Sequence, residues 1–188
     1  MRVTVNRLSS DSVRVRRMVG DRVMIRREEP IDFSYLLGQL GAISYLSDIS
    51  RDARDIYKAI EGAGLMADVP SSVSSIRNTI AFSLDRIERA IREFQQRAGS
   101  EALRMDAEGI KSYVQNIRNI VSGPSFDASW KSCDTANRIY ADVINIEYAV
   151  AHLMSQVSSL VYQYLRDRSP SVIEMMNRYS QLLQRANR

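Results

Sequence analysis

Apolar residues recur at intervals of three and four along almost the whole chain after Pro30, and this spacing restricts the fold more than any other feature. Residues 73–94 show it well, with Val73, Ile76, Ile80, Leu84, Ile87, Ile91 and Phe94. Because an α-helix turns once in about 3.6 residues, these side chains share one face, which must be buried against other helices. We therefore expect an all-α fold, a helical bundle of about five helices.

Start and stop signals divide this region into the five expected helices. The signals are Pro30 with Asp32, the segment GAGLMADVP, the turn AGSE with Ser100 as N-cap, the segment SGPSFD, and Ser169 with Pro170. The fourth helix, expected over residues 128–166, carries apolar residues on two sides. We expect it to be the central element, with more apolar surface than a small bundle covers, which favours a homo-oligomer or filament.

The residues of the first two helices support two further predictions. Gly38, Gly41 and Ala42 leave a smooth patch where another helix or backbone could approach closely. On the outer face of residues 73–97, three acid and arginine pairs are spaced i,i+4: Asp85 with Arg89, Glu88 with Arg92, and Glu93 with Arg97. We expect that face to be solvated.

The first thirty residues follow a different pattern. In SVRVRRMVGDRVMIRREEP, residues 12–30, apolar and basic residues alternate with a period of two on both sides of Gly20 and Asp21. Such alternation around a glycine-containing pair predicts a β-hairpin, and residues 2–5 could add a third strand. We therefore divide the chain into a basic N-terminal arm, residues 1–30, and a helical bundle, residues 31–188.

The arm carries the whole net charge of the protein. It holds eight arginines and four acids, whereas the remaining residues hold eighteen basic and eighteen acidic side chains, and the total is +4. The candidate nucleic-acid-binding residues are Arg2, Arg7, Arg14, Arg16, Arg17, Arg22, Arg26 and Arg27. A guanidinium can grip a phosphate with two hydrogen bonds, so this asymmetry favours a polyanionic partner. A hairpin lying on the bundle with solvated arginines, and an anionic membrane surface, are the alternatives.

The sequence lacks the usual residues of catalysis. His152 is the only histidine and Cys133 the only cysteine, and we assign both to packing. There is no H-E-x-x-H, no paired cysteine and no glycine-rich phosphate loop. We therefore expect no enzyme, no catalytic residue, no metal site and no cofactor, although an enzyme that relies on carboxylates alone stays an alternative. We also expect no signal peptide and no membrane-spanning segment.

These features favour a structural nucleic-acid-packaging protein, which binds the phosphate backbone without reading sequence and self-assembles. The alternative is a helical small subunit or adaptor of a nucleoprotein complex. A short basic arm in front of a compact bundle with tyrosines and small residues resembles the major capsid proteins of filamentous double-stranded DNA viruses of hyperthermophilic archaea. The arm of that family is usually helical, whereas this one is predicted as a hairpin. The resemblance implies a virion location, otherwise a cytoplasmic one, and double-stranded DNA, further copies and a paralogous subunit as partners.

Overall fold

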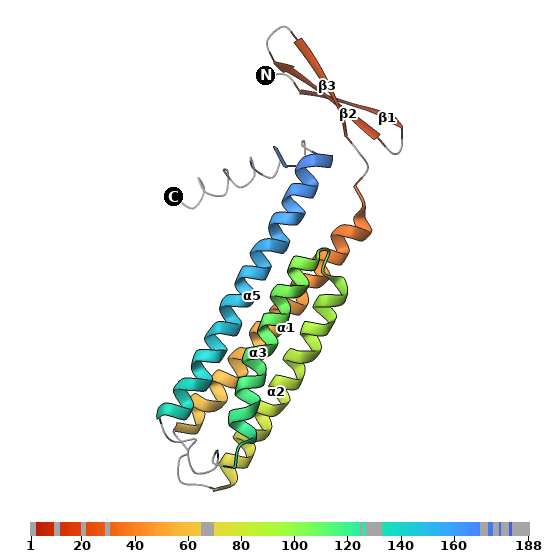
Figure 1. The fold of residues 1–188 in the computed structure, drawn as a ribbon. Helices are drawn as coiled ribbons and strands as arrows, with labels where there is room; N and C mark the ends of the chain where they lie inside the picture. The colour runs from red at the N-terminus through yellow and green to blue at the C-terminus, as the bar shows by residue number, and fades with distance from the viewer. Residues whose placement is uncertain are drawn as a thin grey trace. The chain divides into compact units, whose positions relative to one another are not determined.

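The computed structural model describes residues 3–9, 12–19, 22–28, 31–64, 70–124, 126, 133–169, 173, 174, 177 and 181, and for the first three ranges it describes the backbone alone. The helices in this part are α1 (Phe33–Gly64), α2 (Pro70–Arg97), α3 (Glu101–Ser122) and α5 (Cys133–Arg168), drawn in Figure 1. The prediction of a helical bundle is confirmed for these four helices. The fifth predicted helix, after Ser169, falls almost entirely outside the described residues and stays a prediction.

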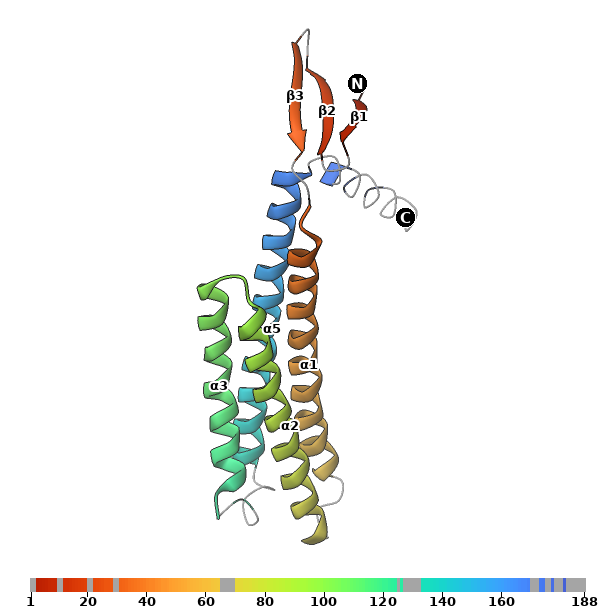
Figure 2. The same ribbon diagram turned by 90° about the vertical axis from the view of Figure 1, so that its right-hand side faces the viewer.

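The chain divides into two compact units. One comprises residues 1–36 and 158–188, and the other residues 37–157. The second unit holds most of the bundle, in which successive helices run antiparallel, up and down in turn (Figures 1 and 2). Short connections favour such antiparallel neighbours, as expected from the sequence.

The core of the second unit consists of the apolar residues that recur at three-four spacing. All of the residues predicted from that spacing in α2 are buried except Val73, which is half-buried. From α3 and α5 the core takes Leu103, Ala107, Ile110, Val114, Ile117, Val121, Ile139, Val143, Ile146, Val150, Leu153 and Val157. The helices are thus amphipathic in the expected sense, and α5 buries one face rather than forming a fully surrounded central element.

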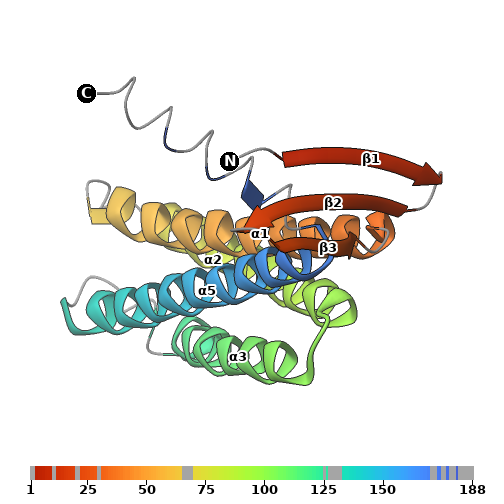
Figure 3. The same ribbon diagram turned by 90° about the horizontal axis from the view of Figure 1, so that it is seen from above.

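Polar contacts join each pair of neighbouring helices around the bundle. They are Arg86–Asp52 at 2.8 Å for α2 and α1, Arg118–Asp85 at 2.8 Å for α3 and α2, Gln156–Asp106 at 3.0 Å for α5 and α3, and Arg54–Glu147 at 3.1 Å for α1 and α5. The order around the bundle is therefore α1, α2, α3, α5. Figure 3 shows these helices from above.

Two helix starts follow the predicted capping chemistry. The Ser100 hydroxyl accepts a hydrogen bond from the backbone N–H of Leu103 at 3.3 Å, which caps α3. Asp32 accepts from the backbone N–H of Ser34 at 2.9 Å, at the start of α1. Both caps were predicted from residue type and position.

The contacts predicted within α1 and α2 differ from those in the structure. A Cβ at Gly38 would meet nothing within 4 Å, and the space beside Gly41 is occupied by the Arg97 side chain, 3.2 Å from the Cβ position, so no backbone approaches there. Asp85 and Glu88 both bind Arg118 of α3, at 2.8 and 2.9 Å. The solvated i,i+4 face is therefore partly an α2–α3 contact, because an arginine on the neighbouring helix lies between the two carboxylates.

Within the first unit, the N-terminal residues form three strands. β1 (Val3–Ser9), β2 (Ser12–Val19) and β3 (Arg22–Glu28) make an antiparallel sheet in the order β1-β2-β3. Val19 is the partner of Arg22, which leaves two residues between β2 and β3, the length of a tight hairpin connection. The predicted turn residues, Gly20 and Asp21, lie outside the described residues.

Candidate nucleic-acid interface

Seven of the eight candidate arginines lie on the described strands. Arg7 is on β1, Arg14, Arg16 and Arg17 are on β2, and Arg22, Arg26 and Arg27 are on β3; Arg2 lies outside the described residues. The backbone pairing gives each of them a partner on the next strand. The strand register therefore decides which arginines are neighbours. The sequence alone does not give this register.

Cross-strand partners lie on the same face of a sheet, and faces alternate along each strand. We call one face the arginine face; it holds Thr4, Asn6, Arg14, Arg16, Met18, Val23, Ile25 and Arg27. We call the other the valine face; it holds Val3, Val5, Arg7, Val13, Val15, Arg17, Val19, Arg22, Met24, Arg26 and Glu28. β1 adds Val3, Val5 and Arg7 to the valine face, and Thr4 and Asn6 to the arginine face.

Arg14 of β2 is the direct partner of Arg27 of β3. Like charges directly opposite one another destabilise a pair of strands. The other arginines of β3 are paired with valines, since Arg26 is opposite Val15 and Arg22 is opposite Val19. An anion held by both arginines would remove the repulsion at the one Arg–Arg pair of the described register.

Several arginines of the bundle, in contrast, already have acidic partners. Arg54 binds Glu147, Arg86 binds Asp52, and Arg118 binds both Asp85 and Glu88. Others lie over aromatic rings, with Arg77 5.5 Å from the Phe126 ring centre and Arg97 5.2 Å from that of Tyr45. These arginines thus take part in contacts within the bundle.

Asp52 is a buried carboxylate that the functional reading of the sequence missed. Its Oδ1 lies 2.8 Å from Arg86 Nη2, an ion pair whose angles do not make it a hydrogen bond. Burial raises the pKa of Asp52, and the charges of Arg86 and Arg51 partly offset that effect. The spacing held a signal, because Asp52 follows Ile49 by three residues and precedes Ile56 by four, on the core face of α1.

Asp142 of α5 is the other carboxylate whose environment raises its pKa. Desolvation raises it, while a hydrogen bond from Asn116 and the charge of Arg138 act in the opposite direction. Asp142 lies in a polar groove of about 620 Å³ between α3 and α5, whereas Asp52 pairs with Arg86 of α2. The two carboxylates thus have different partners on different helices.

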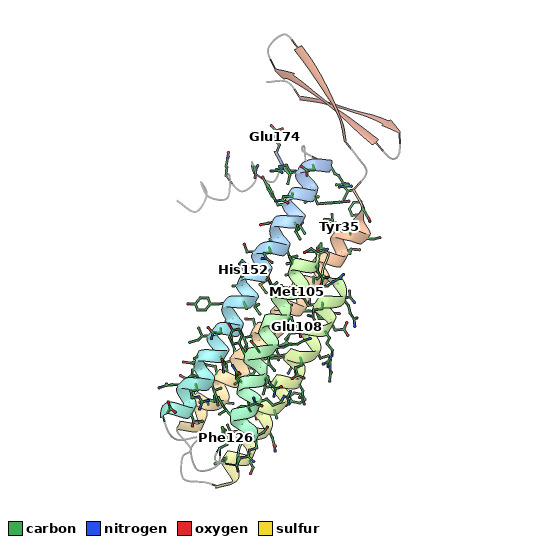
Figure 4. All side chains as sticks on the ribbon, in the orientation of Figure 1. Tyr35, Met105, Glu108, Phe126, His152 and Glu174 are labelled. Carbon is green, nitrogen blue, oxygen red and sulfur yellow. The ribbon has the colours of Figure 1, made fainter. Side chains whose placement is uncertain are left out.

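His152, which the sequence assigns to packing in the core or at an interface, is exposed on α5 and lies beside Gln156, which contacts α3. The Gln156 side-chain nitrogen lies 2.8 Å from His152 Nε2 and donates to Asp106 of α3 at 3.0 Å. Figure 4 shows His152 on α5 and Met105 on the neighbouring helix α3. Among the described residues, no group of three or more His, Cys, Asp or Glu side chains could hold a metal ion. The side chain of Cys133 lies outside the described part.

A groove of about 860 Å³ separates α1 from α5. Its lining includes Arg51, Arg54 and Lys58 of α1 and Ile144 and Tyr148 of α5. The Tyr148 side chain is 73% exposed and that of Ile144 45% exposed. Apolar side chains of this size at a groove are typical of surfaces that contact another protein.

Comparison of the chain with protein-family models, with curated proteins and with solved structures gives no significant match. None of the described helices combines the length and apolarity needed to cross a bilayer.

Proposed function

We propose that this chain is a structural nucleic-acid-packaging protein of the capsid or nucleocapsid type, whose N-terminal arm binds the phosphate backbone and whose bundle self-associates. The observation that carries the proposal is the charge distribution: residues 1–30 hold the whole net charge of +4. Phosphate neutralisation by arginine supplies binding that is independent of base sequence. A packaging protein needs binding of this kind.

The proposed partner is double-stranded DNA, and the proposed location is the virion, otherwise the cytoplasm. The architectural resemblance to major capsid proteins of filamentous archaeal viruses supports both. Self-association, with copies of this chain or with a paralogous subunit, is supported by exposed Tyr148 and Ile144 beside the α1–α5 groove. An adaptor of a nucleoprotein complex would share the arm but stay monomeric when purified.

The salt dependence of DNA binding tests the role of the arm. Each phosphate neutralised on duplex DNA lowers log K by about 0.9 per unit of log salt. With four to six engaged arginines we expect a slope of about −4 to −5, with little dependence on base sequence. Deleting residues 1–29 should flatten the slope, and the helical circular dichroism signal should persist because α1 begins at Phe33.

Equal affinity and an equal slope for the truncated and the full chain would refute a DNA-binding arm. In that case the exposed arginines of α2, such as Arg89, would be the next candidates. A preference for duplex RNA over duplex DNA would replace the proposed partner but keep the arm as the contact. Binding to phosphatidylserine vesicles, with none to either nucleic acid, would favour the membrane alternative.

A further inference from the structure

We infer that the arginine face of the sheet, and in particular Arg14, Arg16 and Arg27, is the surface that contacts duplex DNA. The inference rests on the proposed function and adds to it an assignment of residues. It comes from the strand register, which the sequence alone does not supply.

The first argument is the repulsion within the arginine face. Arg14 and Arg27 are direct partners, and Arg16 is two residues from Arg14 along β2 and diagonal to Arg27. Diagonal neighbours in an antiparallel pair lie about 7–8 Å apart, still within reach of long side chains. Three cationic residues thus share one small area, which a bound phosphate group would stabilise by charge-assisted hydrogen bonds.

The residues of β1 that lie beside the arginines are polar. On β1, the partner of Arg14 is Asn6 and that of Arg16 is Thr4. Asparagine and threonine side chains also make hydrogen bonds to phosphate and sugar oxygens in complexes with DNA. The β1 positions beside the arginine cluster are therefore polar, whereas on β3 the partner of Arg16 is Ile25.

The third argument concerns the opposite face. Among its members are Val3, Val5, Val13, Val15, Val19 and Met24. A small sheet gains stability when one apolar face is covered, and the long aliphatic part of an arginine can lie along such a surface. The valine face also carries four arginines, Arg7, Arg17, Arg22 and Arg26, which are interspersed among these apolar positions.

Two triple variants that remove the same charge from opposite faces test the assignment. One is Arg14→Gln with Arg16→Gln and Arg27→Gln, and the other is Arg7→Gln with Arg17→Gln and Arg26→Gln. The measurement is the affinity of the full chain for a short duplex DNA of mixed sequence over a range of salt. The arginine-face triple should reduce the magnitude of the slope by about 2.7, from 0.9 for each of three phosphates, and the valine-face triple should reduce it by a smaller amount.

A pair of single variants separates loss of contact from loss of sheet structure. Arg27→Glu places a carboxylate opposite Arg14 and so should stabilise the strand pair, yet it should weaken DNA binding more than tenfold. Arg26→Glu, opposite Val15, changes the charge equally and should weaken binding less. Lysine at positions 14, 16 and 27 together should preserve most of the salt slope, because the positive charges remain.

The possible outcomes distinguish this inference from the proposed function. Equal effects of the two triples, or a larger effect of the valine-face triple, would overturn the face assignment and leave the DNA-binding arm intact. If the parent does not bind duplex DNA, or if both triples bind as the parent does, the proposed role of the arm fails and the face assignment fails with it.

Discussion

Arg86 Nη2 on α2 lies 2.8 Å from Asp52 Oδ1 on α1, and the two side chains differ greatly in exposure. The Arg86 side chain is 35% exposed and that of Asp52 only 2% exposed. Arginine can therefore turn to solvent if the pair is broken, whereas the aspartate cannot. Loss of Arg86 would therefore leave a buried charge that water cannot solvate, whereas loss of Asp52 would leave an arginine that can turn to solvent.

We expect Arg86→Met to destabilise the bundle far more than Asp52→Asn does. Removing Arg86 leaves a buried carboxylate whose ion pair with Arg51 spans 3.8 Å, and breaking a buried pair in this way costs about 3 kcal/mol. Removing the Asp52 charge leaves an arginine that water can solvate. Urea unfolding at neutral pH measures both, with Arg89→Met, at an exposed position of the same helix, as the control. Similar losses for the two variants would refute the asymmetry.

The raised pKa of Asp52 predicts a pH dependence of stability. The folded protein holds the Asp52 proton more tightly than the unfolded chain, so this group favours folding most at pH values below its ordinary pKa of 3.8. That contribution is lost as the pH rises through the raised pKa. Relative to Asp52→Asn, the parent should therefore lose free energy of unfolding as the pH rises above about 4. A constant difference between the two proteins over that range would contradict the prediction.

Replacing glycine by alanine should have different effects on stability where the space beside the glycine is empty and where it is occupied. A Cβ at Gly38 meets nothing, so Gly38→Ala should stabilise α1 by about 0.5–1 kcal/mol through its higher helix propensity. A Cβ at Gly99 would lie 3.1 Å from the amide nitrogen of Gln39, which is buried, so Gly99→Ala should gain nothing or destabilise. Thermal unfolding of the two variants measures the difference, and equal shifts in Tm would argue against it.

Self-association should depend on the α1–α5 groove. The double variant Ile144→Ser with Tyr148→Ser removes the two large exposed apolar side chains of α5 at that groove. We expect the parent to sediment as a species larger than 21.4 kDa and the double variant as a monomer. Met105→Ser, an equally exposed change on α3, is the control and should leave the oligomer intact. A monomeric parent, unchanged by added duplex DNA, would exclude the coat-protein proposal.

Replacing the only histidine and the only cysteine tests their assignment to packing and polar contacts. His152→Gln keeps a hydrogen-bonding group beside Gln156, and Cys133→Ala removes a thiol at the start of α5. Each variant should bind duplex DNA within a few-fold of the parent. A loss greater than about a hundredfold, with an unchanged helical signal, would reveal a role in a site that the described residues do not show.

Much of the local structure was predictable from the sequence because its causes are local. The three-four spacing of α2 predicted its buried face, and the residue types at Asp32 and Ser100 predicted two helix starts. A cap or an amphipathic face depends on residues within a few positions of one another. The concentration of arginine in residues 1–30 was likewise visible without any coordinates.

The tertiary structure alone decided which polar groups meet. Asp85 pairs with Arg118, thirty-three residues away, rather than with Arg89 one turn along α2, and His152 is exposed on a helix whose pattern suggested burial. These outcomes depend on how far each helix is rotated about its axis and shifted along its neighbour, which residue spacing within one helix does not encode. Strand register has the same character: it makes Arg14 the partner of Arg27 and Val15 the partner of Arg26, and a shift by one residue would exchange the faces.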